Sequence, residues 1–557
     1  MSVAPVRCLR PPEPVDPPTG VRRADLAAPA VLVALSVLVA CYDVAGSGPA
    51  WPDAPRYANG AAMIHDWLAS GDLGHPYRFA LANYARYPAF SIPYHPPVYP
   101  GLLGAFFLVT GVSYTAARVF IGFCLGASVS VFYATVRRQG ISAWASLGCS
   151  LLLMTFPEVV VWSRDTMSEI PALAFILAAS FLFLKWLDTS RPAHAWAAFG
   201  LAELAFLCRV TSAGVLPAWF LYAALSGRFR RLFSRQAVVA SALYLSVNLC
   251  YLSFAARFSK FETTANPTLG GVGRFTWDNV AYYPAHLPAM IGWGGLAAAA
   301  AGAACTVRAP RRGSGAFWSC WLLSYSGFQW VVATNEQRYF LFALPGACGL
   351  AASLFNPGAP GIVRRRLAPA LLAVALGCNT VQAGSTPRGL VGYDAVARGL
   401  INLKAPGNVM LACLYFQDLV FRVRSHQPQP PRSLLRSDRT LAIRLSPYTG
   451  VTPDVVARSV EDVEGFVRRG RVRYLVTCAP VDPKHDDRPE EMVLAHEVAR
   501  SSPVAFAGVS VSPLLVEFGG RGQGHRYQVY VWEYRRTLPD GPSDLPVVIP
   551  TAGLDYK

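Results

Sequence analysis

Charged residues are scarce in this chain. Only 15% of its 557 residues are Asp, Glu, Lys or Arg, whereas soluble domains average about 25%. The 12 cysteines form no CxxC pair and no zinc-ligand spacing, and the sequence has no glycine-rich nucleotide loop and no internal repeat. The low charge argues against a soluble globular protein, and the missing motifs give no support for a zinc module, a nucleotide-binding fold or a repeat array.

Long apolar runs take the place of charge. Hydrophobic residues make up 53% of the chain, and two examples of such runs are Leu26–Ala45 and Ala237–Phe254. A helix needs roughly 20 apolar residues to cross a bilayer core of about 30 Å. We therefore expect an all-α polytopic bundle of about 11 spans, at residues 26–43, 115–136, 141–157, 169–187, 193–208, 211–226, 237–255, 286–306, 316–333, 339–356 and 367–383.

The net charge of +17 comes from short basic clusters between the apolar runs. We interpret them as topology signals and expect no nucleic-acid partner. With the N-terminus in the cytoplasm, the clusters at 137–138, 185–191, 228–235, 308–312 and 364–366 all fall inside, and the acidic loops fall outside. The sequence thus predicts a multi-pass protein of the plasma or inner membrane, with residues 1–25 as a disordered cytoplasmic tail and residues 26–383 as the transmembrane domain.

The first outer loop is long, from about residue 44 to 114. This assignment requires that Pro97–Gly111, which is short and rich in Pro and Gly, be an interfacial or re-entrant helix rather than a span. An amphipathic helix is predicted at Pro55–Ser70.

Beyond residue 384 the composition changes, and no span is predicted. Strand-like segments at 408–414, 472–478 and 527–532 alternate with helical candidates at 392–403 and 459–469. This pattern predicts a small extracytoplasmic α/β or α+β domain at residues 384–557. Cys413 and Cys478 lie in this region, and the sequence leaves open whether they pair.

The first candidate site opens the long outer loop. Asp53, followed by Arg56 and Tyr57, is placed at the membrane surface, where a carboxylate can act as a general base toward an acceptor hydroxyl. The alternative is that Asp53 caps a helix, because Pro55 follows it near a helix start.

The second candidate lies in the next outer turn. Glu169 stands at the entry of a span, where ionisable groups tend to face a cavity and serve function, and Asp165 is its rival. The alternative is that Arg164, Asp165 and Glu169 satisfy one another at helical spacing.

Two further outer segments carry aromatic and basic residues. Tyr94 and His95 precede rigid prolines that can fix them beside a lipid phosphate, or they form a stiff interfacial turn. Arg338 and Tyr339 lie in a short turn, where a guanidinium suits a phosphate leaving group or serves as an interfacial anchor. Arg209 is a second phosphate-binding candidate.

Together these motifs resemble the C-type glycosyltransferase superfamily. The similarity is greatest to the branch of protein O-mannosyltransferases, the aminoarabinose transferase of lipid A and bacterial lipopolysaccharide glycosyltransferases. It rests on the order of PDAPRYANGAAM, YHPPVYPGLLGAF, SRDTMSEIP and NEQRYFLFALP over roughly residues 26–385.

The resemblance implies a polyprenyl-phosphate sugar donor and a lipid, glycan or protein acceptor, which meet at the outer face of the membrane. Membrane lipids are further expected partners. It implies Asp53 as the catalytic base, Glu169 or Asp165 as a second acid, and donor contacts from His95, Arg338 and Tyr339. Many relatives carry an Asp-Glu pair at the first motif, whereas Ala54 follows Asp53 here. We therefore expect no cofactor and no metal site, although a divalent metal is used in the oligosaccharyltransferase branch.

Two other function classes compete with a transferase. A transporter or flippase would be expected to have broken helices and charged residues near the membrane midplane. This chain has few charges there, and Glu203 is the exception. A structural or receptor protein would act through its C-terminal region. Convergence of Asp53 and Glu169 on one lipid-accessible cavity would favour the transferase.

Overall fold

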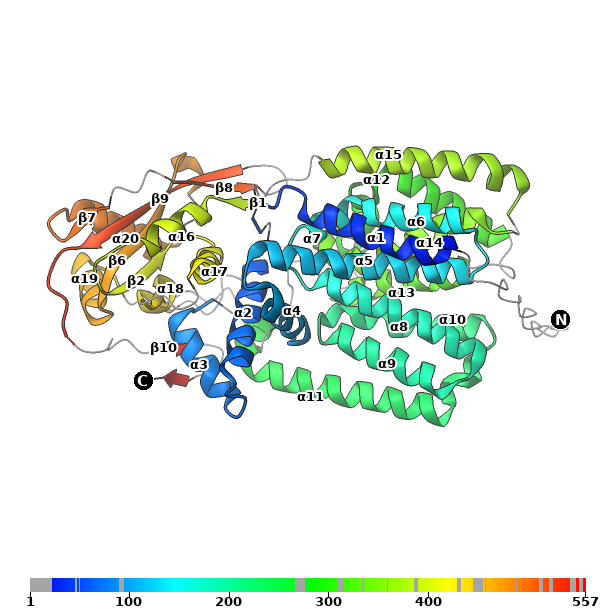
Figure 1. Cartoon of the computed structure of the whole chain (residues 1–557), viewed down its shortest axis with the longest axis horizontal. Helices are drawn as coiled ribbons and strands as arrows, with labels where there is room; N and C mark the ends of the chain where they lie inside the picture. The colour runs from blue at the N-terminus through cyan, green and yellow to red at the C-terminus, as the bar shows by residue number, and fades with distance from the viewer. Residues whose placement is uncertain are drawn as a thin grey trace.

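The chain forms a helical bundle and a sheet-containing C-terminal region in the computed structural model (Figure 1). The structure describes residues 23–556 except 46–47, 50, 90–94, 266–275, 309–314, 333–334, 358, 385–388, 428–431, 444–453, 456, 487, 510–513, 520–523, 541–546 and 550–553. The expected tail at 1–25 lies almost wholly outside the described residues.

The bundle contains the apolar segments expected from the sequence. Its α-helices are α1 (Arg23–Cys41), α5 (Tyr114–Arg138), α6 (Ala143–Thr155), α7 (Pro157–Ser163), α8 (Glu169–Thr189), α9 (Pro192–Phe206), α10 (Val215–Leu225), α11 (Arg235–Ala265), α12 (Trp277–Arg308), α13 (Gly315–Val332), α14 (Leu344–Ala352) and α15 (Ala368–Gly384). Shorter turns η1 (Val210–Gly214), η2 (Phe229–Phe233), η3 (Gln337–Ala343), η4 (Ser353–Phe355) and η5 (Val363–Leu367) connect several of them.

Six helical segments within the described residues are long and apolar enough to cross a membrane. The number rises to seven if α6 and α7, which meet at an angle of 65°, form one broken span. The eleven expected segments all fall on helices, but several are too short to count alone. Pro157 opens α7 and Gly292 breaks α12 with φ of 73°, as expected where proline or glycine interrupts a helix.

Small residues let the bundle helices approach closely. Gly122 and Gly126, one turn apart on α5, face α1, where an added Cβ would lie 2.7 Å from the Cα atoms of Val37 and Val33. Helices in lipid associate by such close packing, because burying apolar surface gains little there.

Arg138 and Arg228, from two of the basic clusters, meet at one end of the bundle. Asp188, at the end of α8, pairs with both Arg138 and Arg228. Figure 1 shows the start of α1 at this end and the C-terminal region at the opposite end. Two of the basic clusters thus share the end opposite the C-terminal region, while the distribution of charge between the two ends and the orientation in the membrane stay predictions.

The long loop after α1 folds into three helices between the bundle and the C-terminal region (Figure 1): α2 (Ala54–Ser70), α3 (Pro76–Arg86) and α4 (Val98–Thr110). α4 covers the expected non-spanning segment and is about 20 Å long, less than a bilayer core. It packs on α2 so closely that a Cβ on Gly104 would lie 2.8 Å from the carbonyl oxygen of Ala61.

The C-terminal region is built on a seven-stranded mixed sheet of order β1-β8-β9-β6-β2-β3, with β7 also paired to β9. Its strands are β1 (Gly389–Val391), β2 (Asn408–Ala412), β3 (Leu434–Arg436), β6 (Val472–Pro480), β7 (Phe506–Gly508), β8 (Leu514–Gly519) and β9 (Gly524–Tyr534). β2 is parallel to β3 and β6, and the remaining pairs are antiparallel. Two strand pairs stand apart: β4 (Ala442–Ile443) with β5 (Asp454–Val455), and β10 (Val547–Ile549) with β11 (Leu554–Tyr556).

Helices flank this sheet. They are α16 (Tyr393–Ile401), α17 (Phe416–His426), α18 (Ser437–Thr440), α19 (Val460–Arg469) and α20 (Glu490–Ser501), with the turn η6 (Pro483–His485). Alternate residues of β2 and β6 enter two different apolar clusters, one containing α16 and α17 and the other containing α19 and α20. Cys413 and Cys478, whose pairing the sequence left open, are buried free thiols.

Candidate functional site

Asp53 lies directly before α2, where the sequence allows either a helix cap or a base. Its side chain accepts no capping bond from the helix. Instead Oδ1 lies 3.0 Å from Nη1 of Arg56, and Oδ2 lies 3.5 Å from Nη1 of Arg338, which is 285 residues away in the chain. The carboxylate therefore serves a tertiary ion pair rather than the cap.

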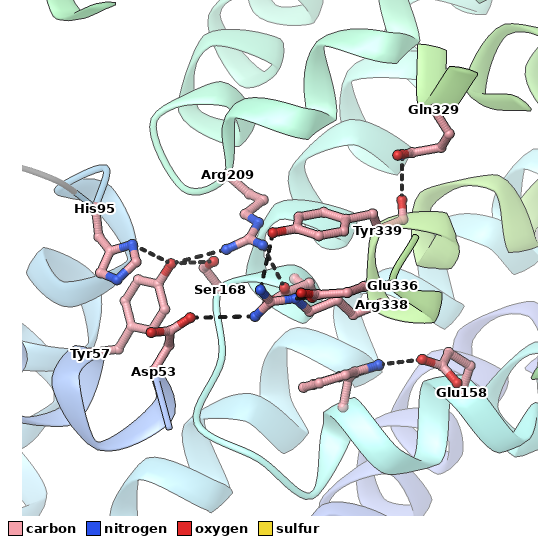
Figure 2. A network of polar contacts seen from close by, with 12 residues as sticks. Asp53, Tyr57, His95, Glu158, Ser168, Arg209, Gln329, Glu336, Arg338 and Tyr339 are labelled. Atoms are coloured by element: carbon pink, nitrogen blue, oxygen red, sulfur yellow. Dashed lines mark hydrogen bonds and ion pairs between the residues drawn. The ribbon is translucent and has the colours of Figure 1, made fainter. Parts of the chain in front are cut away.

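Tyr57 stands one helical turn after Asp53 and is buried. Its hydroxyl accepts hydrogen bonds from Oγ of Ser168 at 3.1 Å and from Nη1 of Arg209 at 3.3 Å, and lies 3.2 Å from Nδ1 of His95. One hydroxyl thus joins α2 to the start of α4, the turn before α8 and the turn after α9 (Figure 2).

Glu169 and Arg209 form a buried pair. Glu169 is fully buried at the first position of α8, and its Oε1 lies 3.2 Å from Nη2 of Arg209. The sequence allowed Glu169 to pair locally with Arg164 and Asp165. In the structure its cationic partner is instead Arg209, in the turn after α9.

Arg338 sits between acids and aromatic rings. Its Nε lies 2.5 Å from Oε2 of Glu336, and its Nη2 donates to the hydroxyl of Tyr339 at 3.0 Å. The guanidinium carbon also lies 4.6 Å from the ring centre of Trp51, and that of Arg209 lies 5.0 Å from the ring of Tyr339. Tyr339 thus contacts both cations, as Figure 2 shows.

The surroundings set the charge of Asp53 and His95. Burial alone would raise the pKa of Asp53, but nearby positive charge outweighs it and lowers the pKa to about 2. Burial lowers the pKa of His95 to about 3, so His95 is neutral at physiological pH. The guanidinium groups of Arg56, Arg338 and Arg209 are then the cations that keep Asp53 ionised.

The chain is similar to membrane glycosyltransferases. A family model described as dolichyl-phosphate-mannose-protein mannosyltransferase matches residues 94–258. This chain superimposes on the crystal structure of ArnT from Cupriavidus metallidurans bound to undecaprenyl phosphate with a TM-score of 0.55 and 14% sequence identity. The alignment covers 90% of this chain and 97% of ArnT. Its apo structure is 15% identical with a TM-score of 0.57, covering 91% and 98%.

A third likeness comes from another branch. The apo oligosaccharyltransferase of Archaeoglobus fulgidus is 12% identical with a TM-score of 0.52, and the alignment covers 81% of this chain and 69% of that one. No protein of curated function matches the sequence. The chain has the fold of the C-type glycosyltransferases. The resemblance read from the motifs is confirmed at this level.

Most of the described residues proposed from the sequence lie in this network, but Arg164 and Asp165 do not. Arg164 donates to the carbonyl oxygens of Val39 and Ala383 and covers the ring of Tyr42, so it ties α1 to the end of α15. Asp165 is buried and accepts a hydrogen bond from the backbone nitrogen of its neighbour Thr166. Tyr94 lies outside the described residues.

The structure adds residues that the sequence did not single out. Ser168 and Glu336 stood in the motifs without an assigned role, and Trp51 directly precedes the first motif. The structure places each of them against the tyrosines or arginines of the site. Glu158 was hidden at the end of an apolar run. It is buried, accepts a hydrogen bond from Nε1 of Trp162 at 2.6 Å, and thereby holds the ring that packs edge-on against Trp51 at 5.9 Å.

No group of three or more His, Cys, Asp or Glu within the described ranges is arranged to hold a metal ion. Metal-independent chemistry stays a prediction from the sequence.

Proposed function

We propose that the chain is an integral membrane glycosyltransferase that moves a sugar from a polyprenyl-phosphate donor to an acceptor hydroxyl, with Asp53 as the general base. The active site lies on the outer face of the cell membrane, and the acceptor is a lipid, a glycan or a protein.

The observation that carries this proposal is the pair between Asp53 and Arg338. A carboxylate, which can act as a base, and a guanidinium, which can bind an anion, lie 3.5 Å apart at the end of the bundle next to the C-terminal region. Glycosyl transfer from a phosphate needs both groups, because a proton leaves the acceptor while negative charge develops on the leaving oxygen. Arg209 adds a second cation against the ring of Tyr339.

The transfer step moves one proton and one glycosyl group. Asp53 accepts the proton of the acceptor hydroxyl, and that oxygen forms a bond to the anomeric carbon. The bond between this carbon and the phosphate oxygen breaks, and its electron pair stays on the polyprenyl phosphate. Arg338 and Arg209 neutralise that phosphate, a role for which guanidinium geometry is well suited.

The donor class is supported by fold likeness to ArnT, whose crystal structure is bound to undecaprenyl phosphate. A lipid-borne donor also agrees with a site placed beside apolar helices rather than on a nucleotide-binding fold.

The test uses the full-length protein in lipid nanodiscs with a panel of polyprenyl-phosphate sugars and a mixed acceptor extract. We expect wild-type turnover that is lost in Asp53→Ala and kept in Asp72→Asn, an exposed acid of the same loop. Turnover that survives in a folded Asp53→Ala variant would refute Asp53 as the base. Movement of the intact lipid-linked sugar across the bilayer, with no bond broken, would refute the transferase and establish a flippase.

A further inference from the structure

The C-terminal region contacts the helix that carries the base. α17 runs against α2, and the amide of Asn59 on α2 donates to the carbonyl oxygen of Gln417 at 2.9 Å and to that of Pro55 at 2.7 Å. Both Asn59 and Gln417 are buried. This contact lies on the turn that follows Asp53 and Tyr57, so α17 touches α2 beside the candidate site.

A second contact closes the other end of α2. Arg424 of α17 is 3% exposed and binds Asp66 with two nitrogens, Nη2 to Oδ1 and Nε to Oδ2, the latter at 3.1 Å. His65 and Asn83 also lie within hydrogen-bond distance of the Asp66 carboxylate, at 2.9 and 3.5 Å. A two-pronged bond between a buried guanidinium and a carboxylate fixes both distance and orientation.

We infer that Arg424 is a positioning residue, which holds α2, and with it Asp53, in place through the Asp66 carboxylate. Asp66 lies about 20 Å along the helix axis from Asp53, and a straight helix transmits a shift of one end to the other. Arg209 and Arg338, the candidate phosphate-binding residues, belong to turns of the bundle, whereas Arg56 lies on α2 close to Asp53. Loss of the Arg424–Asp66 pair is therefore expected to displace Asp53 more than it displaces Arg209 and Arg338.

The first measurement needs no knowledge of the reaction. Hydrogen–deuterium exchange of residues 54–70 is followed in the full-length protein in nanodiscs. The proteins compared are wild type, Asp66→Arg, Arg424→Asp and the double variant that carries both substitutions. Each single variant is expected to raise exchange of α2 on the order of tenfold, the size of a lost charge-assisted hydrogen bond. The double variant restores the opposite charges and is expected to return to within about threefold of wild type.

The matched control is Arg398→Ala, which removes an exposed guanidinium whose partner, Asp394, belongs to the same C-terminal region. It is expected to leave the exchange of α2 unchanged. The proposal is overturned if the single variants leave α2 unchanged, if exchange rises equally in α5, or if the double variant is no better than the singles.

The second measurement rests on the proposed function. Arg424→Asp is expected to lower kcat while affinity for undecaprenyl phosphate stays within about threefold of wild type or increases. A loss of affinity as large as the loss of kcat would refute the separation of base and phosphate site. If wild type turns over no polyprenyl-phosphate sugar, the proposed function fails, and the exchange measurement still decides whether Arg424 positions α2.

Discussion

Asp53→Asn removes the negative charge from the Asp53–Arg338 ion pair and leaves the shape of the side chain almost unchanged. The substitution keeps the size of the side chain and removes its charge, so Arg338 and Arg56 lose their carboxylate. If Asp53 is the base, turnover falls by about 10²–10⁴-fold, the range typical of general base catalysis. If Arg338 binds the donor phosphate, the same variant binds undecaprenyl phosphate more tightly, because its cation is no longer shared.

The structure sets the size of that gain. The pKa of Asp53 lies near 2 instead of 3.8, which corresponds to roughly 2.5 kcal/mol in favour of the ionised form. The side chain is 19% exposed, so most of this interaction is retained. His95 contributes most to this lowering, Arg56 and Arg209 share the remainder with Arg338, and a phosphate recovers only a part of it. We therefore expect affinity for undecaprenyl phosphate to rise about tenfold.

Affinity is measured by titrating the purified protein in nanodiscs with undecaprenyl phosphate, for wild type, Asp53→Asn and the control Asp72→Asn. The control removes the same charge from an exposed position of the same loop. Lower turnover together with tighter lipid binding supports a base and a phosphate cation in contact. Weaker or unchanged binding in Asp53→Asn, with an unchanged thermal midpoint, would refute the competition for Arg338.

Three further predictions follow from the same network. Arg338→Lys keeps the positive charge but loses the two-pronged hydrogen bonding of the guanidinium, so affinity for undecaprenyl phosphate should fall about tenfold in the same titration. A wild-type affinity would contradict phosphate binding by Arg338. Tyr57→Phe removes the hydroxyl that accepts hydrogen bonds from Arg209 and Ser168, so the free energy of unfolding should fall by about 1–3 kcal/mol in thermal unfolding. An unchanged midpoint would refute a stabilising role of this hydroxyl. Because the pKa of His95 is about 3 when folded and ordinarily 6.5, the unfolded chain takes up the proton first, and stability falls as pH drops from 6.5 toward 3. Between pH 7 and pH 5 this amounts to about 2 kcal/mol. His95→Asn should lose that dependence in thermal scans, and parallel curves for the two proteins would contradict it.

The sequence by itself determined the helical segments and the stretches that carry the chemistry. Apolar runs of helical length are a local property, and a bilayer leaves the backbone few alternatives to a helix, so every expected span coincides with helical structure. Proline and glycine also marked the segment at 97–111 as different from the spans, and it forms the short α4. The acids, arginines and tyrosines of the site could be listed because ionisable groups are rare in such a chain.

Only the tertiary structure decided which of these groups meet. Asp53 had a local alternative as a helix cap, and its choice of Arg338 depends on a contact across 285 residues. Glu169 likewise pairs with Arg209 rather than with nearby Arg164, whose guanidinium is taken up by carbonyl groups of α1 and α15. Ion pairs are short-ranged and depend on packing, whereas sequence spacing reports only on neighbours within a helix or strand. For the same reason nothing in the sequence connects Arg424 to Asp66, and the fold alone brings the C-terminal region to the helix of the base.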